Sequence, residues 1–440
     1  GKGAAARAGA VLALLQAEYA DGDPETYVVP LAIASQDLAH ALLTDHPNAG
    51  VAWLEPAAGG PTVLLHDAMV DPVFAEATLR AYRKRLTFTS WGGAEVTMQS
   101  SPEFRRIFDE ADDLTPHLTS VEQSNSSAVF GNQMVVKMFR RAQEGVNPEL
   151  EIGEFLTERA HFPHTASLLG AMEYRRGKAE PRTISVISSY VKNEGDAWHY
   201  TLDALGIYYE DARTLVADGR LDVPDWDSVL DRLDAPVPDN VADAIGPYLD
   251  SAEILGQRTA ELHLALADST ADAFVPEPFT SLYQRSLYQS MRAQVRPTLQ
   301  MVRRNLEHLA EAGVSAVADA EVVIASEAAI LEAFATVTDH RIDTSRISVH
   351  GDYHLGQVLH SGRDFIIIDF EGEPARPATE RRIKRSGLVD VAGMLRSFQY
   401  AARAGLAAFA ERGMVPPDQW AMYEAREQAW QMWVTTRFLA

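Results

Sequence analysis

The sequence contains no cysteine and no long apolar run. Without cysteine, disulfides and thiolate metal sites are excluded, and a cytoplasmic location is expected. No segment approaches the roughly 20 apolar residues that cross a bilayer, so a membrane span is excluded. The chain begins Gly1-Lys2-Gly3 without a methionine and shows no secretory signal pattern. We therefore expect a trimmed chain or an internal segment of a longer protein.

Positive charge is also scarce, because 39 Lys and Arg face 62 Asp and Glu, for a formal charge of −23. Such a surface repels phosphate backbones, which argues against general nucleic-acid binding. Any phosphorylated ligand must be held by local cations or metals. The 440 residues, 46% of them hydrophobic and 23% charged, are typical of a soluble globular protein with two or three structural units.

Three regions differ in their local patterns. Residues 1–112 mix short strand-like and helical runs and are expected to form an N-terminal cap subdomain. Residues 113–192 hold short β-type runs and one helix-like stretch, and residues 193–440 are mostly helical around a single hairpin. The expected fold class is α+β, with the cap followed by a β-rich lobe and a helical lobe.

That hairpin lies in "VHGDYHLGQVLHSGRDFIIIDFEGEP", residues 349–374, which surrounds an apolar strand with carboxylates. If the chain reverses near Arg363, Gln357 lies opposite Asp369. Asp352 enters the same open end from a glycine-rich loop. Three oxygen-bearing side chains then converge, as Mg²⁺ prefers. The alternative is a chance grouping of a capping Asp, a surface Gln and an edge Asp.

The spacing D-x-x-x-x-Q, then a hairpin and an Asp, resembles the catalytic loop and metal-binding Asp of protein kinases, with Gln in place of Asn. In that arrangement Asp352 accepts the proton of the acceptor hydroxyl. Gln357 and Asp369 hold Mg²⁺ against ATP.

A phosphate-binding hairpin should precede this site, and residues 121–141, "VEQSNSSAVFGNQMVVKMFRR", supply one. A two-residue turn at Gly131-Asn132 would place Lys137 opposite Ser126. The serines can offer backbone N–H groups and hydroxyls to phosphate while Lys137 supplies a charge; they are Ser124, Ser126 and Ser127. The chain has no GxxxxGK[ST] motif, and a plain hairpin is the alternative explanation.

A helix capped by Asn147 follows this hairpin. We expect Glu151 to hold Lys137, with Glu149 and Glu154 as alternatives. Further on, the chain becomes loop-like near Lys192, where a hinge would turn the backbone of Ser189 and Val191 toward an adenine.

These residues resemble the maltokinase family, a branch of the aminoglycoside-phosphotransferase-like kinases. The resemblance is carried by "HGDYHLGQVL", "DFEGEPARP", "ERRIKRS" and "DVAGMLRSFQYAA", and upstream by "NPELEIGEFLTE" and "NEGDAW". It implies a bilobal eukaryotic-type protein-kinase-like fold and ATP- and Mg²⁺-dependent phosphorylation of maltose to maltose 1-phosphate, toward α-glucan. Some members are fused to a trehalose synthase, so such a fusion or complex is expected.

The acceptor site is less well specified by the sequence. Tyr423, Glu427 and Trp430 share one helical stripe that suits a sugar ring, although such a stripe also suits a core. Other candidate acceptor contacts flank the hairpin: His354, Glu371, Glu373 and Arg376. A glucosamine or aminoglycoside kinase would share every nucleotide-site residue. A pseudokinase that acts as a binding module is disfavoured, because Lys137 and Asp352 are intact.

Overall fold

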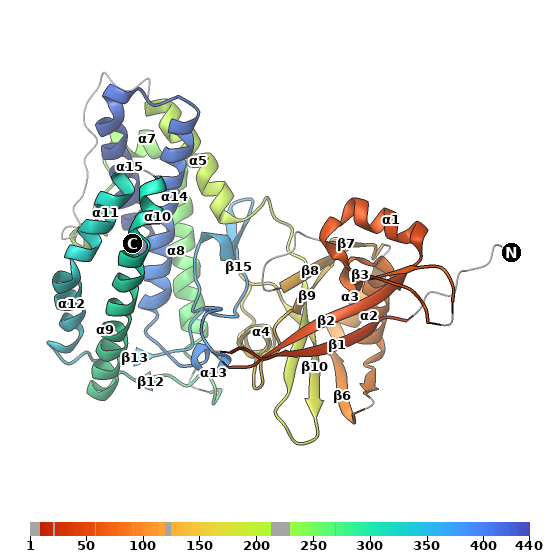
Figure 1. Cartoon of the computed structure of the whole chain (residues 1–440). Coiled ribbons are helices and arrows are strands. Elements are labelled where there is room, and N and C mark those ends of the chain that lie inside the picture. The colour runs from red at the N-terminus through yellow and green to blue at the C-terminus, as the bar shows by residue number, and fades with distance from the viewer. Residues whose placement is uncertain are drawn as a thin grey trace. The chain divides into compact units, whose positions relative to one another are not determined.

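The computed structural model describes residues 9–20, 23–57, 59–90, 92–111, 113–118, 125–212, 229–268, 270–312 and 314–440. The chain divides into two compact units, and Figure 1 labels the helices and strands of both. The first comprises residues 1–266, 349–383 and 388–440, and the second comprises residues 267–348 and 384–387. Among the described residues, no helix is long and apolar enough to cross a bilayer.

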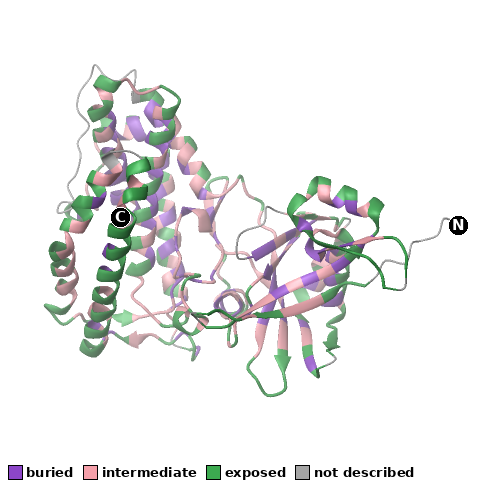
Figure 2. Cartoon of the chain, viewed as in Figure 1, coloured by how far each residue is buried: buried purple, intermediate pink, exposed green. Residues whose placement is uncertain are grey.

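The first unit begins with a four-stranded antiparallel sheet of order β1-β2-β4-β3. Its elements are β1 (Val11–Ala17), β2 (Glu25–Ala34), β3 (Gly50–Leu54), β4 (Val63–Asp67), α1 (Gln36–Asp45), η1 (Pro47–Ala49) and η2 (Ala68–Val70). Alternate residues of β2 are buried, as Figure 2 shows: Val28 packs in the core that includes Met69 and Tyr82, and Ala34 packs in the core that includes α1. Ala34 and Leu64 contact Leu42 of the helix in this small core.

A seven-stranded antiparallel sheet of order β5-β6-β10-β11-β9-β8-β7 follows. Its strands are β5 (Thr87–Thr89), β6 (Ala94–Ser100), β7 (Pro116–Leu118), β8 (Asn125–Phe130), β9 (Met134–Phe139), β10 (Leu168–Arg176) and β11 (Arg182–Ser189), and its helices are α2 (Pro72–Lys84), α3 (Pro102–Glu110) and α4 (Pro148–Glu158). Tyr82 and Phe104 pack with Met134 and Ile184 in its core.

The expected boundary at residue 112 is wrong. β5 and β6 belong to the same sheet as the β8–β9 hairpin, since β6 pairs along its length with β10. This pairing sets Met98 opposite Met172, and both are buried in one core. A strand's local pattern predicts that it is a strand, but the sheet it joins depends on long-range pairing.

The helical part of the first unit surrounds a short hairpin. Its elements are α5 (Ala197–Ala212), η4 (Leu230–Arg232), α7 (Asp239–Ile245), α8 (Tyr248–Ala265), η6 (Leu355–Gln357), β14 (Val358–Ser361), β15 (Asp364–Ile367), α13 (Ala378–Arg381), α14 (Leu388–Glu411), η7 (Pro417–Gln419) and α15 (Trp420–Leu439). Large side chains fill the core between the long helices, among them Tyr209, Phe398, Trp430 and Trp433.

The second unit interrupts the region expected to be one helical lobe. It contains β12 (Glu277–Pro278), α9 (Ser281–Arg304), α10 (Leu306–Ala312), α11 (Val314–Ala325), α12 (Glu327–Ala335), η5 (Thr336–Thr338) and β13 (Ser345–Arg346). The buried Gln284 of α9 donates hydrogen bonds to the carbonyls of Val337 and His340, at 2.9 and 2.8 Å. This amide therefore fixes the segment after α12 against α9.

Candidate active site

Asp352 lies in a turn that two neighbouring groups hold in place. The carboxylate of Asp390 on α14 is 1% exposed and accepts hydrogen bonds from the backbone N–H groups of His350 and Gly351, both at 2.9 Å. The His350 ring bonds through Nε2 to the carbonyl oxygen of Ile368 at 2.9 Å. The loop that carries Asp352 is thus tied both to α14 and to the chain just after β15.

Asp390 is charged although it is buried. Burial alone would raise its pKa, but the His263 ring, 2.9 Å from Oδ2, the nearby His350 ring and the Gly351 N–H together hold the pKa below its ordinary value. The sequence analysis missed this residue. The available signal was an aspartate at the start of an otherwise apolar helix, "DVAGML".

The hairpin brings Gln357 and Asp369 together, but not in the expected register. A two-residue turn pairs Ser361 with Asp364, so the Gln357 carbonyl accepts from the N–H of Ile368 at 3.0 Å instead of facing Asp369. The predicted pairing is wrong by one residue because the turn is tighter than expected.

The side chains nevertheless meet. Asp369 has a left-handed backbone with φ of 67°, which redirects its carboxylate, and the Gln357 side chain hydrogen-bonds to it. A positive φ is uncommon for a non-glycine residue, although aspartate adopts it more readily than most.

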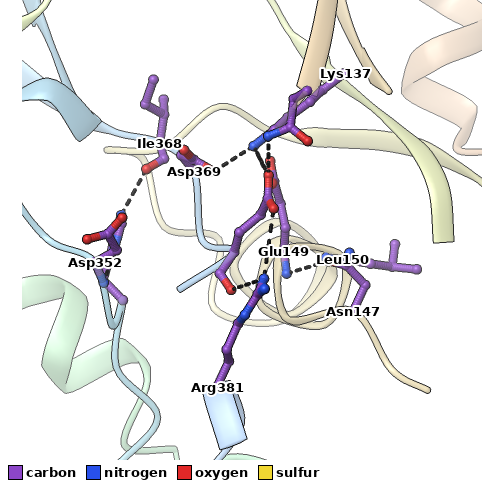
Figure 3. Close-up of polar contacts among 11 residues, drawn as sticks. Lys137, Asn147, Glu149, Leu150, Asp352, Ile368, Asp369 and Arg381 are labelled. Atoms are coloured by element: carbon purple, nitrogen blue, oxygen red, sulfur yellow. Dashed lines mark hydrogen bonds and ion pairs between the residues drawn. The ribbon is translucent and has the colours of Figure 1, made fainter. Parts of the chain in front are cut away.

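Lys137 is surrounded by three carboxylates (Figure 3). Its Nζ lies 2.8 Å from Oε2 of Glu149, 2.5 Å from Oδ1 of Asp369 and 2.6 Å from Oε1 of Glu371. Burial would lower the pKa of Lys137, but the three carboxylates raise it well above its ordinary value. Burial also acts on the carboxylates, and it raises the pKa of Glu149 above its ordinary value. The pKa of Asp369 lies below its ordinary value, because the effects of the Lys137 ammonium and of the Gln357 hydrogen bond outweigh that of burial.

The partner of Lys137 on α4 is Glu149, not the preferred Glu151. Asn147 caps the helix by accepting from the Glu149 N–H at 2.8 Å, and the first turn then directs the Glu149 side chain at Lys137. Glu151 instead forms a two-pronged pair with the Arg382 guanidinium, at 2.8 and 2.7 Å. Glu149 is one of the two alternatives to Glu151, and the spacing of the three glutamates along the helix does not by itself determine which of them faces Lys137.

The phosphate hairpin also differs from its expected register by one residue. Its loop has three residues, so Phe130 pairs with Met134 and Lys137 lies opposite Ser127 rather than Ser126. Ser127 lines the cavity beside Lys137, whereas Ser126 is 3% exposed and faces away from it. The remaining expected residue, Ser124, lies outside the described residues.

One cavity of about 470 Å³ gathers most of the expected nucleotide-site residues. Its walls include Ser127, Lys137, Glu149, Ser189, Val191, Gln357 and Asp369. Apolar side chains of Val135, Leu168 and Leu359 complete an environment that suits a planar base. At the hinge, the Val191 carbonyl accepts from the Asn193 amide at 2.8 Å.

A second cavity has a volume of about 630 Å³. Asp352, His354 and Glu373 line it with three residues that the sequence analysis missed, Trp198, Arg396 and Tyr400. Tyr400 is 56% exposed, and the Arg396 guanidinium lies 4.2 Å from its ring centre. Gly356 lines both cavities, so the two share a wall.

The expected sugar stripe on α15 lies elsewhere. Tyr423 and Trp430 are fully buried in the helical core, and Glu427 pairs with Arg403 at 2.9 Å. Rings that are already packed have no face to offer a sugar, so this expectation is wrong. Of the remaining candidates, Glu371 belongs to the Lys137 cluster, and Arg376 pairs with Glu373 at 2.5 Å.

No protein-family model matches the chain. Two curated relatives are glucosamine kinases: one from Streptacidiphilus jiangxiensis, 26% identical over 285 residues, and one from Mycolicibacterium smegmatis (strain ATCC 700084 / mc(2)155), 23% identical over 283 residues. Each match covers 64% of this chain but only 54% and 58% of the relatives, so the chain spans little more than half of their length.

A solved structure of a glucosamine kinase in complex with glucosamine, ADP and inorganic phosphate aligns with 97% of this chain and 83% of its own, at a TM-score of 0.58 and 19% identity. The chain shares its fold with glucosamine kinase. This confirms the expected kinase-like α+β fold with a sheet-rich lobe and a helical lobe. The relatives support the wider kinase-like superfamily, but they do not support maltokinase, maltose or a trehalose synthase partner specifically.

Proposed function

We propose that this chain is an ATP- and Mg²⁺-dependent sugar kinase whose acceptor is an aminosugar such as glucosamine. The observation that carries the proposal is the pair of cavities that share a wall at Gly356. One contains Lys137, Gln357 and Asp369, which suit a nucleotide. The other contains Asp352, the partly buried Trp198 and the exposed Tyr400, which suit a sugar.

The residues present fit a hard divalent cation. Gln357 offers an amide oxygen and Asp369 a carboxylate, and both line the nucleotide cavity. The carboxylate oxygens of Glu149, Asp369 and Glu371 lie within 4.8 Å of one another, so acidic ligands are concentrated where Mg²⁺ would be held. When bound there, Mg²⁺ would neutralise charge on the phosphate oxygens.

Each remaining step uses a side chain of this chain. A sugar hydroxyl is a weak nucleophile, and Asp352, held by the Asp390-bound loop, orients it and accepts its proton. A bond forms between that oxygen and the γ-phosphorus as the bond to the β-phosphate oxygen breaks. Lys137, which has three carboxylate partners, supplies a cation for the phosphates.

Maltose is the second candidate acceptor, and one observation favours it. Arg396 places a positive charge over Tyr400 within the acceptor cavity, which opposes an ammonium group and suits a neutral sugar. Against this, the Asp352 carboxylate lines the same cavity and would attract an ammonium group. We favour the aminosugar because both curated relatives are glucosamine kinases.

An ATP-consumption assay across glucosamine, maltose, glucose, trehalose and kanamycin tests the proposal. We expect kcat/KM to be highest for glucosamine. A preference for maltose would keep the nucleotide site and Asp352 but replace the acceptor. No sugar-dependent ADP formation with any of the five would contradict the proposed function.

A further inference from the structure

Arg140 joins the N-terminal sheet β1–β4 to the back of the phosphate hairpin β8–β9. We propose that Arg140 is a positioning residue through which this N-terminal sheet sets the affinity of the chain for nucleotide. The inference rests on the proposed function only in naming the ligand of the hairpin as ATP.

The contacts of Arg140 attach it to both structures. Its Nε donates to the Ser126 hydroxyl at 2.8 Å, and its Nη2 donates to the Asp67 carboxylate at 2.5 Å. The Arg140 carbonyl accepts from the Val28 N–H of β2 at 2.8 Å. Backbone and side chain of one residue therefore hold β2, the end of β4 and the hairpin together.

Asp67, the carboxylate partner of Arg140, is itself held in place by a second hydrogen bond. It ends β4, and its Oδ1 accepts from the Met69 N–H at 2.9 Å, which caps the short helix η2. Its other oxygen, Oδ2, is left to receive Arg140. The side chains of Arg140 and Asp67 are only 20% and 24% exposed, so water and salt screen this pair less than an exposed one.

Arg140 contacts the face of β8 that is turned away from the ligand cavity. Neighbouring residues of a strand point to opposite faces. Ser127, opposite Lys137, lines the nucleotide cavity, whereas Ser126, opposite Met138, is buried on the reverse face with its hydroxyl on Arg140. Arg140 is thus placed to fix the height and tilt of the strand that presents Ser127, without itself lining the cavity.

This placement predicts a selective effect. Without Arg140, β8 still presents Ser127 to the cavity but is less ordered. Ordering the strand when the phosphates bind then costs free energy, which weakens the affinity for the ligand. The loop of Asp352 is held separately by Asp390, so the transfer step on bound substrates should be preserved.

The test compares Arg140→Ala with Arg182→Ala as a matched control. Arg182 also joins the N-terminal sheet, since it donates to the Thr26 hydroxyl at 2.8 Å and pairs with Glu144 at 3.1 Å, but it does not contact Ser126. We expect Arg140→Ala to raise the calorimetric Kd for Mg·ATP about tenfold, while Arg182→Ala changes it less than about twofold. At saturating ATP, kcat should stay within about twofold of the unaltered chain for both variants.

Two further variants guard against a folding defect. Arg140→Lys keeps the charge and should recover part of the affinity, because a lysine can bind Asp67 but cannot also reproduce the planar fork to Ser126. Ser126→Ala should weaken binding in the same direction, and its effect should be less than additive with that of Arg140→Ala.

Equal Kd values for Arg140→Ala and Arg182→Ala would overturn the inference, as would a loss confined to kcat. The proposed function fails separately: a chain that binds Mg·ATP but phosphorylates no sugar removes the kinase assignment and leaves the comparison of Kd values intact. A chain that binds no ATP overturns both.

Discussion

Lys137 Nζ lies 2.5 Å from Asp369 Oδ1, although 232 positions separate the two residues in the sequence. This ion pair joins strand β9 to the chain just after β15, and Glu149 and Glu371 complete the surroundings of the ammonium. A phosphate bound to Lys137 would replace Asp369 as a partner of the ammonium, and a cation bound to Asp369 would replace Lys137 as a partner of the carboxylate. Under the proposed function, the cluster would supply charged groups to a Mg-nucleotide complex, and without that ligand these charges neutralise one another.

The role of Asp352 can be separated from binding. Asp352→Asn keeps the side-chain shape but removes the proton acceptor, so we expect kcat to fall by roughly 10²–10⁴. The Kd for Mg·ATP should change little, since Asp352 lines the other cavity. Steady-state kinetics and calorimetry on one preparation measure both, and near-normal turnover in a folded variant would disprove the role.

The two proposed metal ligands should differ in strength. Asp369→Ala removes the charged ligand, and we expect the Mg²⁺ dependence of ATP binding to be abolished. Gln357→Ala removes a neutral oxygen and should weaken that dependence without eliminating it. Calorimetric titrations of ATP with and without Mg²⁺ check this order, and an unchanged Mg²⁺ dependence in Asp369→Ala would contradict the site.

Glu149 and Glu151 form a matched pair of tests on one helix turn. Glu149→Gln should lower kcat/KM for ATP about tenfold, because the Lys137 ammonium loses its fixed partner on α4. Glu151→Gln breaks only the Arg382 pair and should stay within about twofold. If the second change were the more damaging, the assignment of the lysine partner would be reversed.

Asp390 should make the free energy of unfolding depend on pH in the acid range. Its pKa in the folded chain lies below the unfolded value of about 3.9, so its stabilisation is complete above roughly pH 5 and is lost as the pH falls through the folded pKa. Asp390→Asn should destabilise the protein by about 1–3 kcal/mol near pH 7. Urea unfolding from pH 7 to pH 3 should show this difference narrowing in acid, and a constant difference would contradict the assignment.

The sequence located the site because its parts are local. Asp352 and Gln357 lie five positions apart in one loop, and the hairpin returns the chain to Asp369. Ser189 ends β11 and Val191 follows it, and both line the same cavity as Lys137, while their contact with an adenine stays a prediction. Loop spacing and strand alternation thus predicted which residues meet, even where the pairing was off by one.

Other features depend on packing that a single sequence does not determine. One residue more or less in a turn shifts the register of the two strands. This explains why Ser127 lies opposite Lys137 in place of Ser126, and why Ile368 pairs with Gln357 in place of Asp369. The stripe of Tyr423 and Trp430 has the same period whether it faces a ligand or a core. The cavity residues Arg396 and Tyr400 became recognisable only once α14 was placed beside the Asp352 loop.

The most direct test of the central claim is to follow the phosphoryl group by ³¹P NMR with ATP, Mg²⁺ and glucosamine, in parallel with the unaltered chain and with Asp352→Asn. We predict one sugar phosphate for each ADP formed, and almost none from the variant. If the unaltered chain formed ADP and only inorganic phosphate, at a rate independent of sugar, or if Asp352→Asn formed sugar phosphate equally well, the account would be contradicted.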